Sequence, residues 1–211
     1  LHRPAVFKLF DENDDKNKKA EAISDAALKV FREHGYNKTR MADIAQMAGM
    51  GKGTLYEYFK DKGDILRFAF DQYFSVFSEG VLKAMKEKTK PSEKILSLID
   101  FALRHAAEWE DHCAIYVDYF GAARSEERKR LSLSSIYAEM KDILENLIKE
   151  AQSANEIDEK FDPGAVAELL LSIYDGIILH EIFVGQRINM DLTRKTAMSL
   201  ITQGLIIGKS K

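Results

Sequence analysis

The stretch GMGKGTLYEYF, Gly49–Phe59, decides how this chain is interpreted. It places three glycines, a lysine and a threonine just before two tyrosines. Glycine-rich loops of this composition hold nucleotide phosphates in many hydrolysing enzymes. The same composition also suits the tight turn and second helix of a helix-turn-helix that reads DNA. The first possibility predicts an enzyme, and the second predicts a regulator.

The spacing of these residues does not fit a nucleotide loop. That motif needs GxxxxGK followed directly by Ser or Thr, whereas Gly51-Lys52 is followed by Gly53. The first glycine of the motif would fall at position 46, which is Gln46. The preceding segment MADIAQMAG also has helical periodicity, and a nucleotide loop follows a buried strand. These mismatches favour the helix-turn-helix.

The residues on both sides of the glycines fit two short helices that cross steeply. Thr39 is placed to cap the first helix, and Gly49 to end it with a tight turn. A second helix is expected from about Lys52 to Phe59. Ala45 is small enough for the close approach of the two helices. Apolar residues at suitable spacing would lock the pair together: Ile44, Ala48, Met50 and Leu55.

The second helix of such a motif projects its N-terminal residues into the major groove of DNA. Hydroxyl and ammonium groups bind phosphate oxygens, and a glycine lets the backbone approach the duplex closely. The alternative for the tyrosines is burial in a helical core; we expect exposure for Tyr56 and Tyr58, and burial for Leu55 and Phe59. The predicted DNA-binding residues are Thr39, Arg40, Lys52, Gly53, Thr54, Tyr56, Tyr58 and Lys62.

Composition is that of a soluble helical protein of 211 residues, with 45% hydrophobic residues, 31% charged residues and only 3 prolines. The single cysteine, Cys113, excludes an internal disulfide and fits a reducing cytoplasm. No long apolar run predicts a membrane-spanning helix or a signal peptide. The net charge is −3, yet residues 16–66 contain ten Lys and Arg against seven Asp and Glu. The mild positive excess therefore surrounds the glycine stretch.

Helical periodicity continues along the chain, so the predicted fold class is all-α. We expect a polar extension at 1–17, a helix-turn-helix DNA-binding domain at 18–63, and a larger helical effector-binding and dimerisation domain at 64–211. Within them a first helix is expected from Lys18 until Gly35 stops it. Further helical segments are predicted at 64–88, 92–110, 114–121, 127–153, 163–184 and 191–207.

The segment Ala27–Leu66 resembles the DNA-binding domain of TetR-family transcriptional regulators. The resemblance rests on a Phe…Gly-Tyr helix end, an Ile-Ala pair, an Ala-Gly-apolar turn, Lys-Gly-Thr-Leu-Tyr, an aromatic-Phe pair and a lysine. The matching residues are Phe31, Gly35, Tyr36, Ile44, Ala45, Ala48, Gly49, Met50, Lys52, Gly53, Thr54, Leu55, Tyr56, Tyr58, Phe59 and Lys62. The chain departs from the usual pattern at four positions: Arg40, Gly51, Glu57 and Gly63. Gly51 in particular deprives the recognition helix of a hydroxyl cap.

The resemblance implies a cytoplasmic homodimer that binds a palindromic double-stranded DNA operator, most often as a repressor that a small-molecule effector releases. The last two helices, at about 163–184 and 191–207, resemble those that pair in the dimer. Aromatic residues in the larger domain suggest a lipophilic effector, and core packing is the alternative for each of them. The candidate effector-binding residues are Phe77, Phe101, Trp109, Tyr116, Phe120, Tyr174 and Ile178.

We considered an enzyme and a protein-binding adaptor as alternatives to a regulator. No nucleophile–base pair or metal-ligand set has persuasive spacing, so we expect no catalytic residue, cofactor or metal. His105, Glu108 and His112 share a helical face, but a solvated or pocket-edge face is the simpler explanation. An adaptor would not need the complete helix-turn-helix pattern. The sequence therefore predicts a regulator, without membrane attachment.

Overall fold

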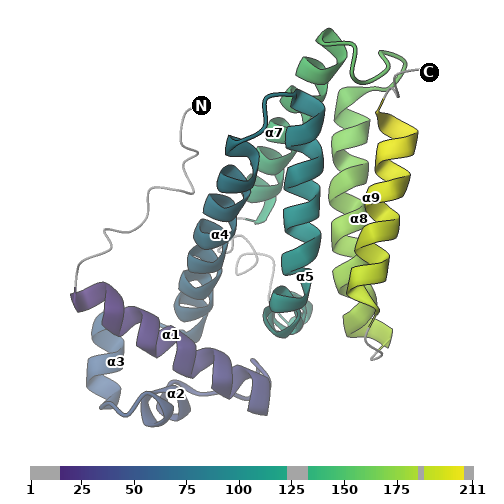
Figure 1. The fold of residues 1–211 in the computed structure, drawn as a ribbon. Coiled ribbons are helices and arrows are strands. Elements are labelled where there is room, and N and C mark those ends of the chain that lie inside the picture. Colours follow the sequence, from purple (N-terminus) through teal and green to yellow (C-terminus); the bar gives the residue numbers. More distant parts are fainter. Residues whose placement is uncertain (1–14, 123–132, 185–187, 207–211) are drawn as a thin grey trace. The chain divides into compact units, whose positions relative to one another are not determined.

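The computed structural model describes residues 15–122, 133–184 and 188–206, and the regular elements within them are α-helices (Figure 1). This confirms the predicted all-α fold. An isolated antiparallel bridge joins Ile157 to Ile206. The helices are α1 (Asp15–His34), α2 (Met41–Met47), α3 (Lys52–Tyr58), α4 (Lys62–Lys86), α5 (Pro91–Ala122), α7 (Leu133–Ser153), α8 (Pro163–Val184) and α9 (Met190–Leu205).

The chain divides into two compact units. The first contains α1, α2, α3, the part of α4 up to Phe77, and α5 from Asp111. The second contains α4 from Ser78, α5 up to Glu110, and α7 from Ser134 with α8 and α9. Both α4 and α5 therefore contribute residues to each unit.

The core of the first unit is built by α1 together with the short helices α2 and α3. The buried face of α1 carries Ile23, Ala27, Val30 and Phe31 at three- and four-residue spacing, as the sequence predicts. Ile44 of α2, Leu55 of α3 and Leu66 of α4 are fully buried with it. Two 7-residue helices are too short to be stable alone, so this shared core is what holds α2 and α3 in place.

The second unit has its own core between α5, α7, α8 and α9. Its buried residues come from all four helices, including Ile95, Leu144, Leu171 and Ile201. At its edge α4 and α5 approach closely, because a Cβ on Gly80 would lie 2.1 Å from the Cζ atom of Phe101. A larger residue than glycine at position 80 would therefore require the Phe101 ring to shift.

Helix boundaries differ from the predictions at several points. Helix α1 begins at Asp15, three residues before the predicted start. The predicted segments 92–110 and 114–121 are one helix, α5, since no glycine or proline interrupts the sequence between them. Residues 1–14 of the predicted extension and 127–132 of a predicted helix lie outside the described residues.

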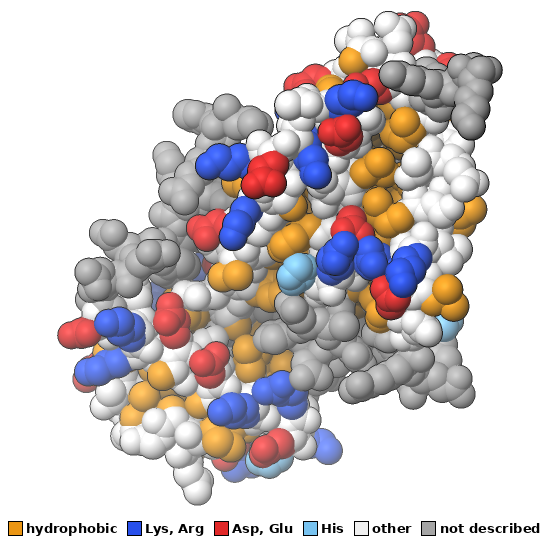
Figure 2. All heavy atoms as spheres, in the orientation of Figure 1, with side chains coloured by type: hydrophobic (Ala, Val, Ile, Leu, Met, Phe, Trp, Pro, Cys, Tyr) orange, Lys and Arg blue, Asp and Glu red, His pale blue; other side chains and the backbone are white. Residues whose placement is uncertain are grey.

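Helix α8 is more apolar than the sequence analysis recognised. Within the described residues, Pro163–His180 is the one segment long and apolar enough to cross a membrane by length and composition, and 17% of it is buried. Leu169 is 62% exposed on this helix, and Leu200 of α9 is 67% exposed. In the second unit, hydrophobic side chains also gather on the face of α5, α8 and α9 that Figure 2 shows, with basic and acidic groups among them.

Candidate DNA-binding site

Two glycines shape the chain around the short helices. Gly35 follows α1 with φ of 78°, and Gly49 follows α2 with φ of 66°, both in the left-handed region that favours glycine. The turn after α2 is held by backbone hydrogen bonds from Ala48 N to Ile44 O at 2.9 Å and from Met50 N to Ala45 O at 3.0 Å. The predicted roles of Gly35 and Gly49 as helix-ending residues are confirmed.

The start of α2 differs from the prediction. Arg40, not Thr39, is the N-cap residue, and its backbone N–H donates to Asp43 Oδ2 at 2.8 Å. Thr39 is buried, and its hydroxyl donates to the carbonyl of Gly35 at 2.9 Å. The end of α1 leaves carbonyls without helical partners, which is why this one accepts the nearby hydroxyl. Thr39 thus braces the α1–α2 connection, while Arg40 is exposed.

Helix α3 separates its residues by face. Leu55 is 0% exposed and anchors the helix, and Phe59, which follows it, is buried edge-on against Phe68 at 5.4 Å between ring centroids. Their predicted burial is confirmed. The exposed side of α3 carries Lys52, Gly53, Thr54 and Tyr56.

The exposed polar groups of α3 are not used to hold the fold. Tyr56 is 47% exposed, whereas Tyr58 is half-buried. Lys52 Nζ lies 5.9 Å from the ring centroid of Tyr56. Among the described residues, Lys52, Thr54 and Tyr56 form no side-chain hydrogen bond or ion pair. Their donors therefore remain available to an external acceptor.

The glycines at the start of α3 are not required by the fold. Gly51 is the N-cap residue of α3, and because glycine has no side chain, no hydroxyl caps the helix, as the sequence indicated. Its φ is −68°, a value that other residues also adopt. A Cβ on Gly53 would meet no heavy atom within 4 Å. Glycine within a helix costs about 0.5–1 kcal/mol relative to alanine. The packing of the protein therefore does not explain why position 53 is glycine.

Lys62, the first residue of α4, binds three backbone carbonyls of this unit. Its ammonium group donates to the carbonyls of Tyr36 at 2.6 Å, Asn37 at 3.1 Å and Thr39 at 3.1 Å. It also lies 4.5 Å from the centroid of the Tyr36 ring. An ammonium has three donors, and all three have acceptors here. Lys62 therefore ties the start of α4 to the α1–α2 connection.

The structure brings most of the predicted DNA-binding residues onto α3 or beside it. Lys52, Gly53, Thr54 and Tyr56 share its exposed side. Thr39 and Lys62 instead meet at the α1–α2 connection, where their polar groups point to backbone carbonyls. Sequence reasoning missed this carbonyl cluster, since backbone acceptors leave no signal in residue type.

The predicted effector-binding residues do not all lie at one site. A small apolar cavity of the second unit is lined by Tyr174 and by residues of α5, α7 and α8, among them Leu98, Met140 and Leu170. Ile178 is buried, Phe101 stacks on the His105 ring at 4.0 Å, and Phe77 stacks on Tyr73 in the first unit. Among the effector candidates, the side chains of Trp109, Tyr116 and Phe120 lie outside the described residues. The same holds for the side chains of Glu108 and His112.

A charged cluster fastens α9 to α5 in the second unit. Asp100 accepts hydrogen bonds from Arg104 Nε at 2.7 Å and from the guanidinium of Arg194. Burial raises the pKa of Asp100, but the hydrogen bonds from the two arginines outweigh it and hold that pKa below its ordinary value. His105 Nδ1 lies 2.9 Å from the carbonyl of Phe101, one helical turn back.

A helix-turn-helix in front of a larger helical unit is the architecture of TetR-family regulators, and the comparisons with known proteins agree. Residues 23–68 match the model of bacterial regulatory proteins of the tetR family. Residues 91–205 match the BetI-type transcriptional repressor C-terminal model. The chain belongs to the TetR family, and it is a DNA-binding transcriptional regulator.

Relatives cover nearly the whole chain. It is 27% identical to the fatty acid metabolism regulator protein of Bacillus subtilis over 190 residues, covering 90% of this chain and 97% of that protein. The FadR regulator of Bacillus subtilis in complex with stearoyl-CoA matches with a TM-score of 0.72 and 25% identity, covering 87% of this chain and 98% of that one. FadR from Bacillus halodurans matches in fold, with a TM-score of 0.75 and 23% identity over 92% of this chain and 98% of that chain.

Proposed function

We propose that this regulator is a homodimeric repressor that an acyl-CoA releases from a palindromic operator in the cytoplasm. It is a binding protein in this proposal, not an enzyme. The domain division proposed from the sequence is kept, with DNA binding at 18–63 and effector binding with dimerisation at 64–211. The single observation that carries the DNA-binding site is the exposed side of α3, whose polar groups and Gly53 have no function within the fold.

At the operator, α3 enters the major groove. Lys52 and Thr54 lie in its first turn, where recognition helices meet base edges and phosphates. Gly53 lets the helix backbone approach the duplex, and Tyr56 gives its hydroxyl to a phosphate or stacks on a sugar. Arg40, exposed at the start of α2, binds the backbone, and Tyr58 contributes from its half-buried position.

Thr39 and Lys62 support the DNA-binding surface indirectly. Their polar groups point to carbonyls of the α1–α2 connection, so they set the position of α2 and α3 relative to α4. This revises the direct DNA contact predicted for both residues. Lys62 would have to give up one of three carbonyls to reach a phosphate.

The dimer is formed through α8 and α9. Leu169 and Leu200 are large apolar side chains that these helices leave exposed, while Leu170 and Ile201 beside them in sequence are buried in the unit's own core. Helices that are apolar on more than one face need a second surface to cover them. A second copy of the chain supplies that surface in the proposal, rather than a membrane.

The effector enters the apolar cavity beside Tyr174. Its walls come from α5, α7 and α8, and its volume is about 20 Å³, which is room for about one water. An acyl chain therefore has to move these helices apart. The acyl-CoA class is suggested by the relatives that regulate fatty acid metabolism and by the stearoyl-CoA complex.

Release follows from linkage between the two ligands. An effector that favours the opened cavity shifts the population towards a dimer whose two α3 helices no longer match successive major grooves. The same coupling requires that operator DNA weakens effector binding by an equal factor.

Fluorescence anisotropy with a duplex from upstream of the chain's own gene tests the proposal. We expect sequence-preferring binding that weakens as salt rises, and release by stearoyl-CoA but not by CoA alone. Absence of any sequence-preferring complex at low salt would overturn the DNA-binding proposal. A complex that stearoyl-CoA leaves intact would overturn only the effector class.

A further inference from the structure

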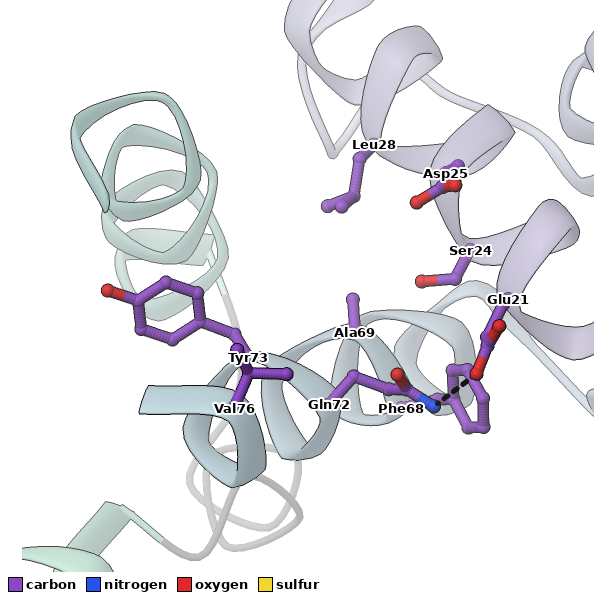
Figure 3. A pocket seen from close by; sticks show the side chains of 9 residues that line it. All are labelled: Glu21, Ser24, Asp25, Leu28, Phe68, Ala69, Gln72, Tyr73 and Val76. Atoms are coloured by element: carbon purple, nitrogen blue, oxygen red, sulfur yellow. Dashed lines mark hydrogen bonds between the residues drawn. The ribbon is translucent and has the colours of Figure 1, made fainter. Parts of the chain in front are cut away.

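A second pocket lies within the first unit, between α1 and α4. Figure 3 shows Glu21, Ser24, Asp25 and Leu28 on α1 facing α4 across this space. The wall from α4 consists of Phe68, Ala69, Gln72, Tyr73 and Val76. Its volume is about 250 Å³, far larger than the cavity beside Tyr174 and close to the lower end of the range for small-molecule sites.

We propose that this α1–α4 pocket is a binding site for a small protonated amine that carries a short apolar group. It is a second ligand site, beyond the effector site of the proposed function, and it does not depend on the identity of that effector.

The polar end of the pocket consists of acceptors. The carboxylates of Glu21 and Asp25 lie at the rim, one helical turn apart. Glu21 accepts one hydrogen bond, from Gln72 Nε2 at 3.3 Å. Asp25 forms no hydrogen bond or ion pair within the described part of the chain, and neither does Lys29, one turn further along α1. Neither carboxylate is paired with a cation of the fold among the described residues, so both can attract the positive charge of a ligand.

Ser24 supplies independent evidence for a ligand. It is 4% exposed, and Figure 3 shows its hydroxyl directed into the pocket. Serines within helices commonly donate to the carbonyl four residues back, as Ser172 does to Glu168 at 2.8 Å. Ser24 forms no such bond with any described residue. The hydroxyl of this buried residue therefore lines the pocket without a partner among the described residues, and a ligand that enters the pocket can bond to it.

The rest of the pocket selects for an apolar group. Leu28 and Ala69 are buried in its floor, and Val76 at its edge is 70% exposed. An ammonium beside Ser24, Glu21 and Asp25 has three donors for three acceptors. An alkyl chain of a few carbons then covers the valine and leucine, at about 0.8 kcal/mol per buried methylene. Anions are disfavoured by the two carboxylates.

Hexylammonium tests the site, with hexanol as the uncharged probe and hexanoate as the anionic probe of the same length. Titration of the full chain is followed by calorimetry and by NMR of the methyl groups of Leu28, Ala69 and Val76. We expect hexylammonium to shift these methyl signals, to bind at least about tenfold more tightly than hexanol, and to weaken as salt rises. Hexanoate should leave them unshifted.

The variant Glu21→Gln/Asp25→Asn should lose at least about tenfold in hexylammonium affinity. Both residues are exposed, so the fold should persist, and a melting curve checks this. Glu57→Gln, which removes an exposed carboxylate of α3 outside the pocket, is the matched control and should bind normally. Equal affinity for hexylammonium and hexanol, or equal binding by the double variant, would refute the site. Operator binding does not enter this measurement, so its failure and that of the proposed function are distinguishable.

Discussion

The surface of α3 and the surface of α8 and α9 expose different kinds of side chain. Polar groups are exposed on α3, and leucines are exposed on α8 and α9. Helix α3 buries Leu55 completely and exposes ammonium and hydroxyl groups. Helices α8 and α9 bury one set of apolar residues and expose another, including Leu169 and Leu200. The first surface suits a charged partner such as DNA, and the second suits an apolar partner such as a second copy. Exposed chemistry, rather than helix type, distinguishes the two regions.

The same residue type can therefore serve folding in one region and association in the other. Leu55→Ala should lower the free energy of unfolding by about 2–5 kcal/mol, because it leaves a cavity in a fully packed core. Leu169→Ala removes a 62% exposed side chain and should change the stability of the monomer by less than about 0.5 kcal/mol. Urea unfolding at two protein concentrations checks both. Only the Leu169 effect should depend on concentration; the reverse pattern would contradict the assignment of the two regions.

Charges on the exposed leucines should break the dimer. In the double variant Leu169→Glu/Leu200→Glu, carboxylates would have to be buried at the proposed interface, at a cost of several kcal/mol. We expect a folded monomer by analytical ultracentrifugation, with weaker operator binding because each half-site is then bound singly. The fold should persist, since both substituted residues are exposed. A double variant that remains dimeric would place the interface elsewhere.

Variants of Lys52 and Lys62 distinguish a residue that contacts DNA from one that positions the DNA-binding helices. In the proposal, Lys52 makes the contact and Lys62 does the positioning. Lys62→Met leaves three carbonyls without their donor, so we expect a loss of about 1–3 kcal/mol in stability and weaker operator binding. The slope of log affinity against log salt should stay unchanged. Lys52→Met should leave stability intact and reduce that slope by about 0.9, the value for one phosphate contact. A reduced slope for Lys62→Met would restore the direct contact that the sequence suggested.

Gly53 should affect stability and operator binding in opposite directions. Gly53→Ala should stabilise the free protein by about 0.5–1 kcal/mol, since the added Cβ meets open space. The same methyl group should weaken operator binding by at least about tenfold, because it prevents close approach of α3. Thermal unfolding and anisotropy measure the two effects. Unchanged operator affinity would show that the backbone at Gly53 does not approach the duplex.

Features of the DNA-reading unit that depend on neighbours in sequence were predictable. The positive φ at Gly35 and Gly49, the burial of Leu55 and Phe59, and the exposure of Tyr56 all follow from local spacing. The capping residue of α2 was misplaced by one position, because a carbonyl just after the preceding helix engages the hydroxyl of Thr39 and Arg40 is the N-cap residue. That carbonyl comes from Gly35, which sequence reasoning treated only as a helix end.

The larger unit was less predictable, since its aromatic residues carry no local signal of burial. Tyr174 lines the cavity, whereas Phe77 belongs to the other unit and Phe101 packs against Gly80 and His105. All three are aromatic residues in helices of similar composition. Which of them meets a cavity depends on how α5, α7 and α8 pack.

The sequence by itself determined the all-α fold, the helix-turn-helix and the family, because helical periodicity and turn glycines act over a few residues. Only the tertiary structure decided what surrounds Lys62 and Ser24. Lys62 finds its three carbonyls more than twenty residues away in the chain, and Ser24 faces a wall made by α4. Such contacts depend on how helices distant in sequence pack together, and residue spacing does not encode that packing directly.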